Sequence, residues 1–263
     1  MEQNTSSLIY LSYLDLILGF SLILIAAGLS KWKELKLEKD LIIASLRTFL
    51  QLIGVGFILK YVFESNNSIL VLFFIFVMIT VAVFTVIRDK ESIFSNLSFI
   101  VSFALISSSG ITVFLVTQII INIDPWYSPQ YLIPITGMVI GNSINGASIA
   151  IDRLDSEIRE KKDKIEALLC LGATSHQSCA DIIRSSMMAS LIPTINSMMI
   201  VGIVTFPGIM TGQILSGISP ISAIKYQIII MYMIAFSVTF CSYLIINLRY
   251  KSYFTKDHQY IHK

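Results

Sequence analysis

Seven apolar stretches, separated by shorter polar segments, divide this sequence. Most of them reach the roughly 20 residues that an α-helix needs to cross a hydrocarbon core about 30 Å thick. The pattern therefore predicts seven transmembrane helices. Their approximate limits are Leu8–Leu29, Leu41–Phe63, Ile69–Ile87, Leu97–Ile121, Leu132–Ile151, Ile183–Thr205 and Ala223–Leu248.

Lysine and arginine occupy alternate connections between these stretches. The first, third and fifth connections and the C-terminal tail hold 16 of the 19 basic residues, and the connections at 64–68, 122–131 and 207–222 hold none. Cytoplasmic loops carry the excess of basic residues in membrane proteins. The N-terminus is therefore predicted outside and the C-terminus inside, which itself requires an odd number of helices.

Composition agrees with this interpretation. The chain has 263 residues, of which 55% are hydrophobic and 14% charged, whereas a soluble domain carries about 25% charged residues. We expect an all-α polytopic protein of the cell inner (plasma) membrane, surrounded by lipid and forming a single domain over residues 1–263. Its charged segments mix both signs, which argues against nucleic-acid binding, and its three cysteines are scattered, which argues against a disulfide framework.

Charged groups inside the predicted spans suggest a pathway. A charge in hydrocarbon costs at least about 2.5–3.5 kcal/mol, so it normally faces a partner or a watery cavity. Asp15 lies in the first span and Arg47 in the second, and Gln51 shares a helical face with Arg47. We predict that these residues line a substrate pathway. The alternatives are a side chain reaching the interface for Asp15 and a structural hydrogen bond between helices for Arg47 and Gln51.

The fifth span combines small and amide side chains. Gly137 and Gly141 have the spacing that lets helix backbones approach closely, and Asn142 and Asn145 follow them. This pattern predicts the packed centre of a bundle, with a dimer seam as a second interpretation. Asn142 and Asn145 are added to the predicted pathway residues.

No charged residue occurs from Ser185 to Ile224, a section rich in proline, glycine and methionine. Prolines and glycines here predict kinked or broken helices, which membranes tolerate where the backbone lines a cavity. The outer connection supplies the predicted gate residues: Pro207, Gly208, Gly212 and Gln213. Methionine sulfur is a soft metal ligand, but in a span it more often serves as a flexible apolar side chain. The identity of any metal ligand stays open.

The longest charged segment follows the fifth span. Residues 152–166 contain 11 charged residues in 15, with apolar residues at helical spacing, which predicts a helix projecting into the cytosol. We treat residues 152–182 as a cytosolic coupling element. Within it, Glu166-Ala167-Leu168, Gly172-Ala173 and Ile182 resemble the EAA loop of ABC transporter permeases, in which a short helix, a glycine turn and a second helix dock on an ATPase subunit. Where that loop has Leu-Pro, this chain has Arg184-Ser185.

Longer motifs carry a wider resemblance, from about Lys31 to Tyr253. They are Arg47-x3-Gln51, IPITGMVIGNSINGASIA at 133–150, LGAT at 171–174, ASLIPTINSMM at 189–199, and FPGIMTGQILSG at 206–217 followed by Lys225-Tyr226-Gln227. Together they resemble the FetB-type iron export permease family, which also includes plant aluminium-tolerance half-transporter subunits. The resemblance implies an ABC exporter permease, connected in bacteria with iron homeostasis.

The sequence also indicates how such a permease is powered. It contains no G-x4-G-K-[S/T] phosphate loop, so the chain is expected not to be an enzyme and to bind no cofactor itself. ATP and Mg²⁺ are expected on a separate ABC ATPase subunit. Two copies of the permease are expected to form the pathway as a homodimer.

Three other functions remain open. A methionine-type ABC importer permease has a similar EAA region and would need a solute-binding protein. An integral membrane enzyme acting on lipid would need a cluster of nucleophile, base or metal ligands near an interface, and the sequence offers no such cluster. A scaffold that only binds a cytosolic partner would tolerate Arg47→Ala.

Overall fold

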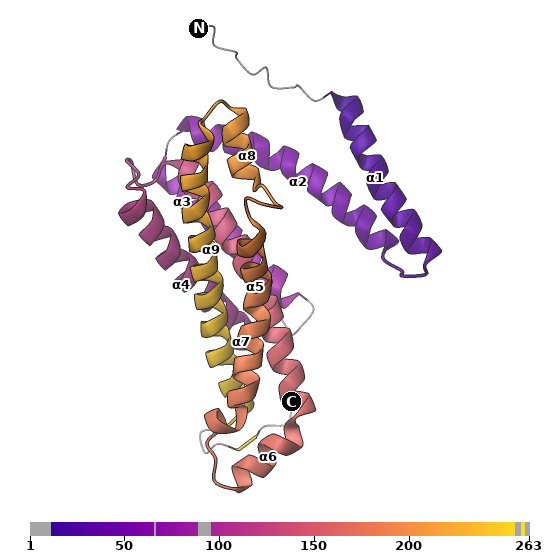
Figure 1. Cartoon of the computed structure of the whole chain (residues 1–263), viewed down its shortest axis with the longest axis vertical. Coiled ribbons are helices and arrows are strands. Elements are labelled where there is room, and N and C mark those ends of the chain that lie inside the picture. Colours follow the sequence, from indigo (N-terminus) through magenta and orange to yellow (C-terminus); the bar gives the residue numbers. More distant parts are fainter. Residues whose placement is uncertain (1–11, 66, 89–95, 256–258, 261–263) are drawn as a thin grey trace. The chain divides into compact units, whose positions relative to one another are not determined.

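The computed structural model describes residues 12–65, 67–88, 96–255 and 259–260. These residues are almost entirely helical, which confirms the all-α prediction (Figure 1). In chain order the helices are α1 (Tyr13–Trp32), α2 (Glu38–Ser65), α3 (Ser68–Ile87), α4 (Asn96–Phe114), the π-helical η1 (Leu115–Ile120), α5 (Pro129–Glu160), α6 (Lys162–Cys170), α7 (Ser175–Ile200), α8 (Gly208–Leu215), α9 (Pro220–Arg249) and the 3₁₀-helical η2 (Tyr250–Tyr253).

Residue contacts divide the chain into two units. Residues 1–66 and 215–217 form the first unit, and the remaining residues form the second. In the first, α1 and α2 pack as a helical hairpin. Its turn is closed by Ser30, whose carbonyl accepts from Leu35 N–H at 2.9 Å and whose hydroxyl accepts from Leu37 N–H at 3.1 Å.

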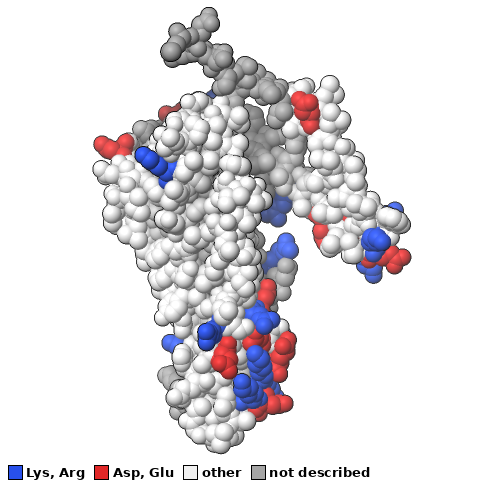
Figure 2. Space-filling model, in the orientation of Figure 1, with Lys and Arg blue, Asp and Glu red and all other residues white. Residues whose placement is uncertain are grey.

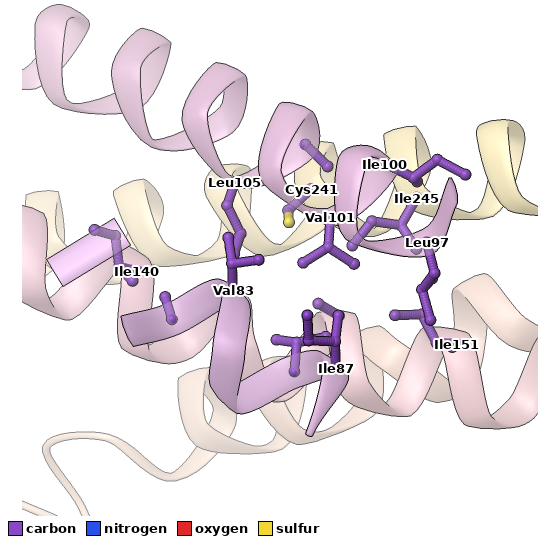
Figure 3. Packing of buried hydrophobic residues seen from close by; sticks show 14 residues of the cluster. Val83, Ile87, Leu97, Ile100, Val101, Leu105, Ile140, Ile151, Cys241 and Ile245 are labelled. Carbon is purple, nitrogen blue, oxygen red and sulfur yellow. The ribbon is translucent and has the colours of Figure 1, made fainter. Parts of the chain in front are cut away.

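The second unit is a bundle centred on α5 and α9, which pack on each other and on α4 and α7. Its main core joins α3, α4, α5 and α9 through small and branched apolar side chains (Figure 3). Val101, Leu105 and Ile245 are fully buried there. Such interlocking is what allows helices to associate where lipid tails are as apolar as leucine.

Within the described ranges, six helices are long and apolar enough to cross a membrane: α1, α2, α3, α4 with η1, α5, and α9 with η2. The chain is therefore a polytopic membrane protein. The predicted span at Ile183–Thr205 corresponds to α7, which is 26 residues long but is not among these six, so the seven-span count and the orientation stay predictions. The start of the first predicted span, Leu8, lies outside the described residues.

Helix α5 extends well beyond the thickness of a bilayer. Its 32 residues correspond to about 48 Å at 1.5 Å per residue, against a hydrocarbon core of about 30 Å. The charged part of its sequence occupies the C-terminal end, which continues into α6. Figure 2 shows that most charged side chains visible on the second unit gather around this end, while the remaining surface is largely uncharged. The predicted projecting helix is thus an extension of a membrane helix.

Candidate functional site

Helices α6 and α7 form a hairpin whose turn is specified by four residues. At the end of α6, Ala173 N–H donates to Leu168 O and Gly172 N–H donates to Leu169 O, both at 3.0 Å. This is the Schellman arrangement, and it requires the left-handed backbone that Gly172 adopts at φ +89°. The LGAT motif therefore ends one helix.

The same motif begins the next helix. Thr174 is the N-cap of α7: its hydroxyl accepts from Gln177 N–H at 3.3 Å, and the Gln177 side chain accepts from Thr174 N–H at 2.9 Å. This reciprocal pair is a capping box. Two terminal motifs placed side by side give a tight turn with little conformational freedom.

The base of the hairpin is buried and its tip is exposed. Ile165 of α6 and Cys179 and Ile182 of α7 lie in a core cluster with Tyr250, Tyr253 and Phe254 from the chain after α9. Burial raises the pKa of the Cys179 thiol to about 11. At the tip, by contrast, Leu171 is 84% exposed. The hairpin is therefore a rigid projection that presents an apolar side chain.

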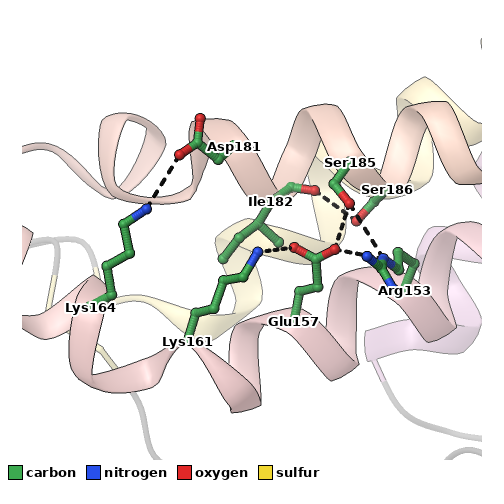
Figure 4. Close-up of polar contacts among 8 residues, drawn as sticks. All are labelled: Arg153, Glu157, Lys161, Lys164, Asp181, Ile182, Ser185 and Ser186. Atoms are coloured by element: carbon green, nitrogen blue, oxygen red, sulfur yellow. Dashed lines mark hydrogen bonds and ion pairs between the residues drawn. The ribbon is translucent and has the colours of Figure 1, made fainter.

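Polar contacts cluster where the hairpin meets the end of α5, and the Ser185 hydroxyl of α7 links the two (Figure 4). The Glu157 carboxylate, with 3% of its side chain exposed, pairs with Arg153 and Lys161, both at 2.6 Å. It also accepts a hydrogen bond from the Ser185 hydroxyl of α7. Lys164 pairs with Asp181 at 3.4 Å across the hairpin. These contacts hold α7 against the projecting end of α5.

A second buried pair joins α5 to α9. Arg249 donates from Nε to Asp155 Oδ1 at 3.1 Å and from Nη2 to Oδ2 at 3.0 Å. The guanidinium also lies over the Tyr253 ring. A bidentate pair of this kind fixes orientation as well as distance. The pair therefore fixes the end of α9 against α5.

The predicted coupling residues divide between the tip and the base. Ala167 and Gly172 are exposed, and Glu166, Leu168 and Ala173 are partly buried. Ile182 is only 2% exposed, so it packs within the bundle and presents no surface. The sequence did not predict that Leu171 is exposed at the tip. It also did not predict that Glu157 contacts Ser185, at the position where Arg184-Ser185 replaces Leu-Pro. The spacing Arg153-x3-Glu157-x3-Lys161 was the available signal.

A polar cleft lies between α5, α7 and α9, along the parts of these helices predicted to span the membrane. Its volume is about 270 Å³. The lining residues are Asn142, Asn145, Gly146, Ile149, Ser190, Pro193, Thr194, Ser197, Met231 and Ile234. The structure therefore brings the two predicted asparagines together with a row of hydroxyl groups on α7. That row was missed, although Ser190, Thr194 and Ser197 recur at helical spacing.

The remaining predicted pathway residues belong to the first unit. Arg47 and Gln51 are exposed on α2. Asp15 occupies the first turn of α1, where its carboxylate accepts from Ser12 N–H at 2.7 Å and completes a capping box. Asp15 thus has a structural role at the start of α1. A pathway role for these three residues stays a prediction.

The predicted gate residues lie at the start of α8 and within it. Pro207 precedes the helix and its carbonyl accepts from Thr211 N–H at 3.0 Å. Gly208 and Gly212 are exposed, whereas Gln213 is partly buried in an apolar cleft with residues of η1, α5 and α9. Their gating role also stays a prediction. Among the described residues, no group of three or more histidine, cysteine, aspartate or glutamate side chains is arranged to hold a metal ion.

A bundle of long apolar helices with a charged helical projection defines a polytopic integral membrane protein. Residues 13–254 match the family described as "Uncharacterised protein family (UPF0014)", and the chain belongs to this family. The "UPF0014 membrane protein slr1647" of Synechocystis is 40% identical to it over 258 residues, covering 96% of this chain and 98% of the relative.

Two further relatives have names that describe a process. The "Probable iron export permease protein FetB" of Escherichia coli is 33% identical over 248 residues and covers 94% of each chain. The "Protein ALUMINUM SENSITIVE 3" of Arabidopsis thaliana is 32% identical over 237 residues, covering 90% of this chain and 85% of the relative. No solved structure matches the chain. The predicted resemblance to FetB-type permeases is confirmed.

Proposed function

We propose that this chain is the permease subunit of an ABC transporter that exports iron or another metal, as a homodimer driven by a separate ATPase. The observation that carries the proposal is the α6–α7 hairpin. Its tip exposes Leu171 at 84%, while its base is buried and joined to α5 by the hydrogen bond from Ser185 to Glu157. A rigid projection of this kind can transmit a displacement at its tip to the membrane helices. ATP and Mg²⁺ would bind the partner.

The polar cleft supports a transport pathway. Its lining from α5 and α7 consists largely of neutral hydroxyl and amide groups. Such groups can replace the waters around a passing cation without holding it tightly, and conduction requires sites that a cargo can leave as well as enter. The name of the FetB relative supports iron as the cargo and export as the direction.

Exposed small and polar groups on α5 support the homodimer. Gly141 and Asn145 are exposed on this helix, and no atom lies within 4 Å of a Cβ built on Gly141. An amide in hydrocarbon gains from a partner on another helix, and glycine permits close approach. Replacing Asn145 by cysteine in a Cys170→Ser background should give disulfide-linked dimers in membranes. Persistently monomeric protein under oxidising conditions would contradict the dimer at this face.

Metal content of cells tests the transport function. Deleting the gene should raise the cellular content of iron or of another metal, measured by mass spectrometry, and wild-type protein should restore it. Gly172→Val should not restore it although the protein reaches the membrane, because a β-branched residue at φ +89° is strained. Gly28→Val, on α1 with open space around it, is the control and should restore it. A lower content of every metal after deletion would favour an importer and contradict export.

A further inference from the structure

Three of the ten methionines line one cleft. Met198 comes from the last turn of α7, Met210 from α8 and Met231 from α9. The cleft has a volume of about 350 Å³, and the other lining residues are Val201, Gly202, Phe206, Ile224, Gln227, Ile228 and Tyr232. We name it the methionine cleft. Met231 also lines the polar cleft, so the two clefts adjoin at this side chain.

One polar side chain in the methionine cleft lacks a partner. Gln227 of α9 is 6% exposed, and its Oε1 atom has no hydrogen-bond partner among the residues that the structure describes. A buried carbonyl oxygen left without a donor is costly, so such an atom in a native structure calls for a ligand or another explanation. The oxygen is an acceptor with lone pairs, which suits a cation.

The end of α7 adds to this preference. The helix ends at Ile200, and a tight turn with Gly202 at φ +83° follows. Gly202 N–H donates to Thr205 O at 2.8 Å within that turn. Met198, Val201 and Gly202 place the cleft at the C-terminal end of α7, where the helix dipole is negative and favours a cation. Irregular backbone at membrane depth is tolerated where it lines a cavity.

We infer that the methionine cleft binds a soft monovalent cation, Cu⁺ or its analogue Ag⁺, through the thioethers of Met198, Met210 and Met231 and the amide oxygen of Gln227. Thioether sulfur favours soft ions over Fe²⁺, Mn²⁺ or Mg²⁺. All residues lining the cleft are neutral, and desolvation cost rises with the square of the ionic charge, which favours one charge over two. The site goes beyond the proposed transport function, since binding requires neither the ATPase nor movement of cargo.

Binding to the purified chain in detergent tests this inference. The experiment uses Cys170→Ser, because Cys170 is an exposed thiol that would itself take Cu⁺. Under ascorbate, competition with a chromophoric Cu⁺ chelator should show one Cu⁺ per chain. Met198→Leu, Met210→Leu and Met231→Leu should each weaken binding at least tenfold. Leucine keeps nearly the volume of methionine, so the fold should persist, and circular dichroism would verify it.

A neighbouring methionine provides the matched control. Met199 is adjacent to Met198 in the sequence but is 73% exposed and does not line the cleft, so Met199→Leu should bind Cu⁺ as tightly as the background protein. X-ray absorption of the loaded background protein should show copper–sulfur scattering that the triple leucine variant lacks. Undiminished binding by a folded triple variant would overturn the inference, as would an equal loss in Met199→Leu or no binding by the background protein.

Discussion

Gly146 lies where α5 packs tightly on α9, and a single methyl group there should destabilise the protein. A Cβ built on Gly146 of α5 would lie 2.6 Å from Val238 Cγ1 and 3.3 Å from Ser242 Oγ on α9. Val238 is 1% exposed and Ser242 is fully buried, so neither can move aside into free space. Gly146→Ala therefore forces α5 and α9 apart or distorts a side chain.

The size of the effect follows from this overlap. Ordinary contacts begin at 3.4 Å, so the added methyl is about 0.8 Å too close to Val238, the difference between 3.4 and 2.6 Å. Overpacking of this kind costs about 1–3 kcal/mol. Val238→Ala removes the opposing methyl groups, and the double variant should recover at least about 1 kcal/mol relative to the sum of the two single variants.

The free energy of unfolding of the purified protein can be measured in detergent by titration with sodium dodecyl sulfate, followed by circular dichroism. Gly110→Ala, on α4 with no atom within 4 Å of the built Cβ, is the control. It should change stability by less than about 0.5 kcal/mol. Equal stability of the Gly146→Ala and Gly110→Ala variants, or strictly additive effects in the double variant, would refute the close contact.

Three further predictions concern the charged end of the bundle. Arg249→Met should lower the free energy of unfolding by about 3–5 kcal/mol in the same assay, because it leaves the Asp155 carboxylate without its bidentate partner. Adding Asp155→Asn should recover part of this stability. An Arg249→Met variant as stable as the wild type would contradict the importance of the pair. A maleimide should label the exposed Cys170 at pH 7–9 but not Cys179, because the buried Cys179 thiol has a pKa of about 11 and forms thiolate only at higher pH. Rapid labelling of Cys179 at pH 8, detected by peptide mass spectrometry, would contradict the burial of this thiol. Gly172→Ala should cost about 1–2 kcal/mol through its left-handed backbone, and unchanged stability would argue against that conformation.

Much of the bundle could be predicted because apolar length is a local property. The runs at 69–87 and 97–121 match α3 and α4 with η1 closely, since the requirement for about 20 apolar residues leaves little choice. The turn at Gly172 could be predicted equally well, because a glycine between two helical patterns indicates a helix end. The helix limits were harder to predict. Helix α5 runs unbroken to Glu160, because no residue between its apolar part and its charged part stops a helix.

Contacts between distant residues could not be read from the sequence. Asp155 and Arg249 are 94 positions apart, and nothing local indicates that these two charges meet. Ile182 fits the coupling pattern by spacing alone, but the periodicity of α7 places it inside the core. The meeting of Asn142 and Asn145 with the hydroxyl row of α7 likewise depends on how α5 packs on α7.

The proposed function depends on contact between the exposed tip of the α6–α7 hairpin and an ATPase. Leu171→Glu tests it, with Leu35→Glu as the control, because Leu35 is 58% exposed in the turn between α1 and α2. Tagged variants would be purified from native membranes, and the co-purified ABC ATPase and its activity measured. We expect Leu171→Glu to fold normally but to lose the ATPase, whereas Leu35→Glu should retain it. Full ATPase recovery and activity with Leu171→Glu would contradict the claim.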